Sequence, residues 1–216
     1  MSEQLPPIDV AFAVFGRTLP ADHAYPLYAA IARCVPTLHQ APWLGIGLIS
    51  GTPLGKGLIR LSSRGARLYM RLPADKYEEA LPIAGQRLNI DGHDLLIGSP
   101  ILARPLMPAP SLYARIVTIK KFVDAEPFLD AARRQIISLG VSADLELPRE
   151  SEGRFRRRII NIKGKSIVGF SVAAHNLSDD DSLCLQRHGI GGRRIMGCGI
   201  FFPISTTTEL QDEKDA

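Results

Sequence analysis

Residues 188–203 read HGIGGRRIMGCGIFFP, and the interpretation of the whole chain starts from this stretch. It combines two adjacent arginines, Arg193 and Arg194, with an apolar strand-like end and with five glycines: Gly189, Gly191, Gly192, Gly197 and Gly199. Glycine permits positive φ and close approach of another backbone segment, so such a loop can turn its N–H groups toward a phosphate. The arginines add fork-shaped donors that suit phosphate. The alternative is a glycine-rich turn that only leads into the last strand.

The spacing of these residues excludes two common phosphate motifs. No Gly-Lys-Ser/Thr follows the glycines, so the loop is not a Walker sequence, and no βαβ unit with a downstream acidic residue follows, as a dinucleotide fingerprint requires. The chain also lacks HxH, HExxH and clustered carboxylates with metal spacing, and it has no GxSxG elbow of a serine hydrolase. We therefore expect no metal and no cofactor.

The elements around the loop follow a regular order in the second half of the chain. Apolar patterning predicts strands and helices alternately, with Gly140 closing one helix and Ser178 capping another. The predicted strands are 112–120, 144–147, 154–162, 166–174 and 198–204, and the predicted helices are 126–139 and 177–186. This order resembles a ferredoxin-like βαββαβ unit.

The first half shows a similar order. A strand over 8–15 is followed by a helix that Asp22 caps and Pro36 ends. Further strands are expected at 44–49, 58–61 and 66–72 (the last two as a hairpin), then a short helix at 75–81 and a hairpin of 87–90 with 94–97 around Asp91-Gly92.

The four prolines of Pro100–Pro110 indicate a stiff linker between the two halves. The sequence thus predicts an α+β protein with two tandem ferredoxin-like (RRM-like) domains, residues 1–108 and 109–205. An acidic tail, 206–216, is expected to be disordered.

Composition limits the class of protein. With 45% hydrophobic residues the chain has enough apolar material for a core. No apolar run approaches the roughly 18–20 residues of a membrane span, and the N-terminus lacks a secretory signal. Three cysteines without a CxxC pair argue against a disulfide framework and a zinc cluster. We expect a cytoplasmic protein without a membrane partner.

The charge is unevenly distributed. The net charge is +4, but the tail 206–216 carries −3, so the remaining 205 residues carry +7. An excess of positive charge on the folded part indicates a polyanionic partner, although many basic domains bind nothing charged.

A run of arginines supplies a specific candidate for that partner's site. Arg154, Arg156 and Arg158 would share one face of the predicted strand, about 7 Å apart, which is the scale of a nucleic-acid backbone. Arg157 belongs to the same run, and Lys163 and Lys165 stand at the adjoining turn. The alternative is a solvated basic edge strand, because charge protects sheet edges from aggregation.

The glycine loop matches the pattern Gly-x-Gly, basic residues, then Gly-x-Gly before an apolar strand. Together with GRTLPADHAYPLYAAIARCVPTLH and WLGIGLISG nearer the N-terminus, it resembles the CRISPR-associated endoribonucleases that process repeat RNA. These belong to the repeat-associated RNA-binding superfamily, and the resemblance, to its myxobacterial-type branch, covers most of residues 8–205. It implies an RNA stem-loop as partner, held through its shape and phosphates. The residues expected to bind it are Arg154, Arg156, Arg157, Arg158, Lys163, Lys165, His188, Gly191, Gly192, Arg193, Arg194, Gly197 and Gly199.

The resemblance also implies metal-independent cleavage, in which the 2′-oxygen attacks the adjacent phosphate to give 2′,3′-cyclic phosphate and 5′-OH ends. This needs a proton acceptor, a donor and a cation, and histidine suits the first role. In the resembled family the catalytic histidine lies on or just after the first helix in a Leu-His context, which favours His39, with His23 as the next candidate. His39 could instead only stabilise the end of the helix.

The remaining candidates are less well defined. Tyr28 could orient the phosphate or donate to the leaving oxygen, or simply pack with a solvated tip. His175 and His188 could touch RNA, whereas His93 falls in a predicted turn. The stabilising cation stays unassigned between Arg33, Lys56 and an arginine of the second domain.

Two rival functions remain open on sequence alone. One is a non-catalytic RNA-binding subunit of a CRISPR interference complex, which the endoribonuclease itself could also join through its bound guide RNA. The other is a structural protein whose basic face is incidental.

Overall fold

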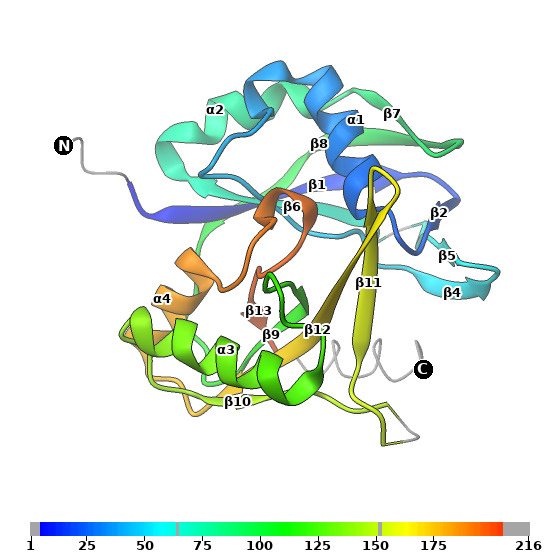
Figure 1. Cartoon of the computed structure of the whole chain (residues 1–216). Coiled ribbons are helices and arrows are strands. Elements are labelled where there is room, and N and C mark those ends of the chain that lie inside the picture. Colours follow the sequence, from blue (N-terminus) through cyan, green and yellow to red (C-terminus); the bar gives the residue numbers. More distant parts are fainter. Residues whose placement is uncertain (1–4, 64, 151–152, 205–216) are drawn as a thin grey trace. The chain divides into compact units, whose positions relative to one another are not determined.

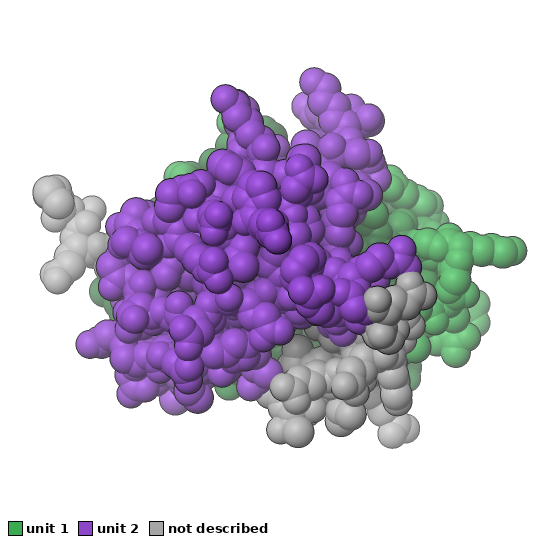
Figure 2. Space-filling view, turned by 60° about the horizontal axis from the view of Figure 1, so that its bottom comes forward, with its two compact units in different colours: residues 1–106, 195–197 green, residues 107–194, 198–216 purple. Residues whose placement is uncertain are grey.

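The computed structural model describes residues 5–63, 65–150 and 153–204, which form two compact units (Figures 1 and 2). The first unit runs to Leu106 and includes Ile195–Gly197, and the second holds Met107–Arg194 and the chain from Cys198 on. The predicted tail, 206–216, lies outside the described residues. No helix in the described ranges is both long and apolar enough to cross a membrane.

The first unit is built on a five-stranded antiparallel sheet in the order β3-β6-β1-β8-β7. Its strands are β1 (Pro7–Phe15), β3 (Gly45–Ile46), β6 (Arg67–Pro73), β7 (Arg87–Ile90) and β8 (His93–Pro105). The helical segments are α1 (Ala24–Cys34), η1 (Pro36–Leu38), η2 (Ala74–Lys76), α2 (Tyr77–Ala80) and η3 (Leu81–Ile83). A small second sheet has the order β2-β5-β4, formed by β2 (Thr18–Pro20), β5 (Leu58–Arg60) and β4 (Thr52–Gly55).

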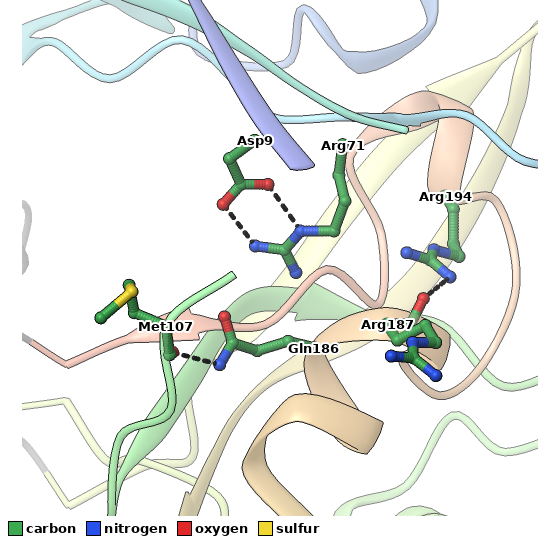
Figure 3. A network of polar contacts seen from close by, with 6 residues as sticks. All are labelled: Asp9, Arg71, Met107, Gln186, Arg187 and Arg194. Atoms are coloured by element: carbon green, nitrogen blue, oxygen red, sulfur yellow. Dashed lines mark hydrogen bonds and ion pairs between the residues drawn. The ribbon is translucent and has the colours of Figure 1, made fainter. Parts of the chain in front are cut away.

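Alternation along β1 fixes which face of this sheet is covered. Val10, Phe12 and Val14 enter the core together with Leu27 and Ile31 of α1, so the helices pack on that face. The other face carries the intervening residues of β1. There Asp9 and Arg71 stand opposite each other on β1 and β6 and form a buried two-bonded ion pair, with Arg71 Nε 2.7 Å from Asp9 Oδ1 (Figure 3).

The second unit repeats the plan with the order β10-β12-β9-β13. Its elements are β9 (Leu112–Val117), α3 (Ala125–Ser138), β10 (Asp144–Glu146), β11 (Arg157–Ile162), β12 (Lys165–His175), α4 (Asp179–His188) and β13 (Phe202–Pro203). The short η4 (Arg194–Met196) stands where the chain passes from this unit into the three residues that belong to the first unit. Phe128, Ala132 and Ile136 of α3 pack with β9 and β12. In each unit the first and third strands of the βαββαβ order are central. The predicted α+β class with tandem ferredoxin-like units is therefore confirmed.

Three two-residue turns set hairpin registers. Lys56-Gly57, Asp91-Gly92 and Lys163-Gly164 each have positive φ at both positions and join directly paired strand ends. Two positive φ values are the mark of a type I′ turn, whose twist matches that of the strands. The predicted Asp91-Gly92 hairpin and the turn at Lys163 are confirmed. Ser178 caps α4 as expected, accepting from the Asp181 N–H at 3.1 Å.

Several expected elements were wrong in extent or pairing. Most of Pro100–Pro110 is not a linker, because β8 runs through Pro100 to Pro105 and pairs with β1. Within the described strands, β7 pairs with β8 only up to Leu96, so these prolines lie along an open edge that needs no N–H donor there. The strands at 58–61 and 66–72 do not pair with each other: β5 joins β2 and β4, and β6 joins β1 and β3.

Two helix ends also differ from expectation. The residue preceding α1 is His23 rather than Asp22, and it provides no side-chain cap. Gly140 does end α3, but as the residue after the cap Leu139, with φ 73°.

Candidate functional site

His39 and Tyr28 form a polar pair in the first unit. The Tyr28 hydroxyl lies 3.1 Å from His39 Nδ1, and the two rings are stacked with centroids 6.1 Å apart. Tyr28 is 6% exposed and anchored in the core by α1, whereas His39, just after η1, is exposed. A buried phenol thus holds an imidazole whose other nitrogen, Nε2, is open to a substrate.

Hydrogen bonding around the phenol oxygen restricts how the pair can work. The Gln40 N–H donates to Tyr28 Oη at 3.3 Å, which leaves this oxygen one further acceptor site and its own proton. If His39 Nδ1–H donates to the phenol, Nε2 carries the lone pair and can accept a proton. If the phenol donates to Nδ1, neutral His39 carries its proton on Nε2 and acts as a donor.

His23 is placed differently. It is fully buried, with Nδ1–H donating to the Pro20 carbonyl at 2.8 Å and Nε2 accepting from the Ile49 N–H at 3.1 Å. Both ring nitrogens are therefore occupied by backbone groups, and the ring ties α1 to the strand and loop around it. A buried ring with both nitrogens engaged cannot exchange a proton with a substrate, so this geometry disfavours a catalytic role for His23.

His93 and His175 contact polar residues other than Tyr28 and His39. His93 is the first residue of β8, and its Nδ1 lies 2.8 Å from Thr18 Oγ1 of β2. His175 Nδ1 lies 3.0 Å from Ser111 Oγ, and its Nε2 lies 3.8 Å from Glu146 Oε2. In the described ranges, no three His, Cys, Asp or Glu side chains are grouped so that they could hold a metal ion.

The arginine run of the second unit leads into a two-stranded arm. Residues 157–168, here called the basic arm, pair only β11 with the first part of β12, because β9 joins β12 from Phe170 onward. Figure 1 shows these two strands extending together. Arg157, Lys163 and Lys165 are exposed on the arm. The arm therefore carries cationic side chains on a surface that a ligand can reach.

The arm begins later than expected. Arg154 and Arg156 precede β11, which starts at Arg157, so the three alternating arginines do not all lie on one strand. Phe155 forms an isolated bridge with Arg149, whose guanidinium lies 4.0 Å from the Phe155 ring centroid. Arg149 is thus a further arginine at the base of the arm. The sequence pattern did not indicate it, because it lies outside the run of arginines at 154–158. Arg158 Nε is buried and lacks an acceptor among the described residues.

The glycine loop is held inward by its own amides. The Gly191 N–H donates to Gln135 Oε1 at 2.7 Å, the Gly192 N–H to the Thr118 carbonyl at 3.1 Å, and the Gly199 N–H to the Ile116 carbonyl at 2.8 Å. These three amides are satisfied inside the protein and, in this structure, do not turn outward toward a phosphate. The loop joins the last strand to β9 and α3 instead.

The arginines of the loop are also engaged. Arg194 Nη1 donates to the carbonyl of Arg187 at 2.6 Å (Figure 3). It also donates to the carbonyl of His188 at 2.8 Å, and Arg193 Nη1 donates to Thr118 Oγ1 at 3.3 Å. His188, the last residue of α4, is exposed; partial burial, and then the charges of Arg187 and Arg194, lower its pKa from the ordinary value. Near neutral pH this imidazole is therefore uncharged.

A comparison with known proteins identifies the family. The family model described as Cas6 Crispr matches residues 8–206. The CRISPR-associated endonuclease Cas6 of Myxococcus xanthus (strain DK1622) is 39% identical over 209 residues, which are 97% of this chain and 86% of that protein. The chain belongs to the Cas6 family. A relationship this extensive confirms the predicted endonuclease class and the predicted CRISPR family.

Solved Cas6 structures share the fold. A structure from a Cas6-related gene of Pyrococcus furiosus superposes with a TM-score of 0.67 at 15% identity, covering 93% of this chain and 99% of that one. A CRISPR-associated protein Cas6 gives 0.63 at 14% identity, covering 92% and 99%. A RAMP protein that binds different RNA substrates gives 0.65 at 17% identity, covering 92% and 99%. At sequence identities of 14–17%, these superpositions support a shared fold, with two ferredoxin-like units in tandem.

Proposed function

We propose that the chain is a metal-independent endoribonuclease that cuts CRISPR repeat transcripts into guide RNAs. The observation that carries this proposal is the exposed imidazole of His39 held by the buried phenol of Tyr28. Such a pair supplies general acid–base chemistry near neutral pH on a chain of the Cas6 family.

The reaction can be written on these atoms. His39 Nδ1–H donates to Tyr28 Oη, and Nε2 accepts the proton of the 2′-hydroxyl. The 2′-oxygen then attacks the adjacent phosphorus, and the bond from phosphorus to the 5′-oxygen breaks. The 5′-oxygen takes up a proton from water and the His39 imidazolium returns its proton to the solvent, so the products are a 2′,3′-cyclic phosphate and a 5′-hydroxyl. The positive charge gained by His39 is stabilised by the phenol oxygen, which the Gln40 N–H orients.

Product analysis tests this chemistry. Repeat RNA is incubated with the protein, and the downstream fragment is offered to a polynucleotide kinase without phosphatase treatment. We expect immediate labelling, because a 5′-hydroxyl is free, and a cyclic phosphate on the upstream fragment by mass. A 5′-phosphate on the downstream fragment would contradict the mechanism. Tight binding without any product would favour the non-catalytic RNA-binding subunit.

Tyr28→Phe tests the role of the phenol. Removing the hydroxyl leaves His39 Nδ1 without its partner and is expected to lower the single-turnover cleavage rate about ten-fold, as for a hydrogen bond to a group that becomes charged. The dissociation constant for RNA should stay unchanged. Tyr25→Phe, on the same helix, is the matched control and should cut normally. Equal rates for the two variants would assign Tyr28 to packing alone.

The basic arm is proposed to hold the RNA stem through its phosphates. Replacing Arg157 and Lys165 together by glutamine should weaken binding and make the slope of log affinity against log salt shallower by about 1–2, since each lost phosphate contact removes roughly 0.9. Arg133→Gln combined with Arg134→Gln, two exposed arginines of α3, provides the control of equal charge change. An unchanged salt slope in the double variant would place the RNA elsewhere.

A further inference from the structure

An exposed aromatic ring stands on the sheet face of the first unit that the helices do not cover. Phe15, the last residue of β1, is 53% exposed. It follows Ala13 by two positions and so shares its face, whereas Val14 points into the core. Arg67 of β6 is paired directly with Ala13 and is exposed. Phe15 and Arg67 are therefore diagonal neighbours, about 7–8 Å apart at Cα, within reach of long side chains.

Small residues form the floor beneath this ring. A Cβ added at Gly98 would lie 2.9 Å from Phe15 Cε2 and 3.2 Å from Ala13 Cβ. The ring thus lies over the Gly98 backbone, where no other side chain could fit. With glycine and alanine around it, one side of the ring rests on the sheet and the exposed side is available to a flat partner.

The segment 23–74, which supplies strands β3 to β6, carries charge of one sign, whereas β8, on the other side of β1, carries the exposed Asp94. Residues 23–74 contain no Asp or Glu but six basic residues: Arg33, Lys56, Arg60, Arg64, Arg67 and Arg71. Over 52 residues this is a marked bias, and among those of the six that the structure describes only Arg71 forms an ion pair, with the buried Asp9. Such a segment attracts polyanions.

Backbone hydrogen bonds hold Arg60 and a further arginine, Arg17, near the end of β1. The Leu61 N–H donates to the Arg17 carbonyl at 2.9 Å, and Arg60 is paired with Thr18 of β2. Arg17 and Arg60 are exposed, and within the described ranges neither side chain has an ion pair or hydrogen bond. Phe15, Arg17, Arg60 and Arg67 thus lie along the same end of the first unit.

An exposed aromatic ring beside unpaired cations is the arrangement that binds single-stranded nucleic acid, because every base has a face that can stack and every nucleotide has a phosphate. We propose that Phe15 stacks on a base of a single-stranded segment of the RNA, with Arg17, Arg60 and Arg67 on its phosphates. This rests on the proposed function for RNA as the ligand. α1 and η1, which bear Tyr28 and lead to His39, pack on the opposite face of the sheet, so this platform binds RNA away from the reacting phosphate.

The test uses an uncleavable repeat RNA with one 2′-deoxynucleotide before the cut, either with its single-stranded flanks or trimmed to the stem-loop. Phe15→Leu keeps an apolar side chain but removes the stacking face, and it should weaken binding of the flanked RNA on the order of ten-fold. Phe15→Tyr should bind like the wild type. Neither variant should change binding of the trimmed stem-loop.

Several outcomes would overturn this inference. Wild-type affinity of Phe15→Leu for the flanked RNA would do so, as would an equal loss for flanked and trimmed RNA, which would place the ring on the stem. A protein dimer that depends on Phe15 would assign the face to a protein partner. Arg67→Gln provides a second variant, expected to make the salt slope for the flanked RNA shallower by about 0.7. Because binding is read on an uncleavable RNA, a failure of the cleavage proposal leaves this test intact.

Discussion

His39→Ala is expected to lower the single-turnover cleavage rate by about 10²–10⁴, the usual contribution of a positioned general acid or base. The imidazole is exposed, and among the described residues its Nδ1 hydrogen-bonds only with the Tyr28 hydroxyl. Removing it therefore takes away the proton acceptor and leaves the core packing of η1 and α1 intact. The affinity for uncleavable RNA should stay close to that of the wild type.

A matched histidine variant separates chemistry from general damage. His175→Ala removes an imidazole from the second unit, where it contacts Ser111 and Glu146, and we expect normal cleavage. The measurement is the rate on end-labelled repeat RNA with protein in excess, together with the dissociation constant. If His39→Ala cuts at the wild-type rate, the proton acceptor is another group and the proposed site is wrong.

Gly199→Ala is expected to destabilise the second unit by about 2–4 kcal/mol. Gly199 has φ 66°, and a Cβ there would lie 2.1 Å from the Ile190 carbonyl oxygen. An alanine would thus add the cost of a left-handed residue, roughly 1–3 kcal/mol, to a clash with backbone that cannot move aside cheaply.

Gly192→Ala is the control from the same loop. Gly192 has no positive φ, and a Cβ there would meet no atom within 4 Å. Urea unfolding should show a change of less than about 1 kcal/mol for Gly192→Ala beside the large loss for Gly199→Ala. If instead Gly199→Ala unfolds like the wild type but loses RNA affinity, the loop serves ligand binding rather than packing.

Local patterns predicted the fold where local physics decides it. The alternation of β1, the turn at Asp91-Gly92 and the cap at Ser178 each act over a few residues. Prediction failed where a distant partner decides the structure. The prolines of β8 look like a linker until β1 pairs with one side of them, and β5 looks like a partner of β6 until β2 and β4 enclose it.

The candidate site divides in the same way. The Leu-His context after the first helix pointed to His39, but only the fold shows that Tyr28, eleven residues earlier, lies beneath it. His23 was the next candidate in sequence, because nothing nearby reveals that the Ile49 N–H occupies its Nε2. The glycine loop suggested phosphate binding, since glycines that pack against Thr118 and Ile116 look the same in sequence as glycines that cradle an anion.

The most direct test of the central claim compares two repeat RNAs that differ only at the nucleotide before the cut, in excess EDTA. The account predicts that wild-type protein cuts the all-ribose RNA, because no metal takes part, and binds but does not cut the RNA with a 2′-deoxy sugar there, because the nucleophile is missing. Cleavage of the deoxy RNA at that position, or loss of all cleavage in EDTA, would contradict it.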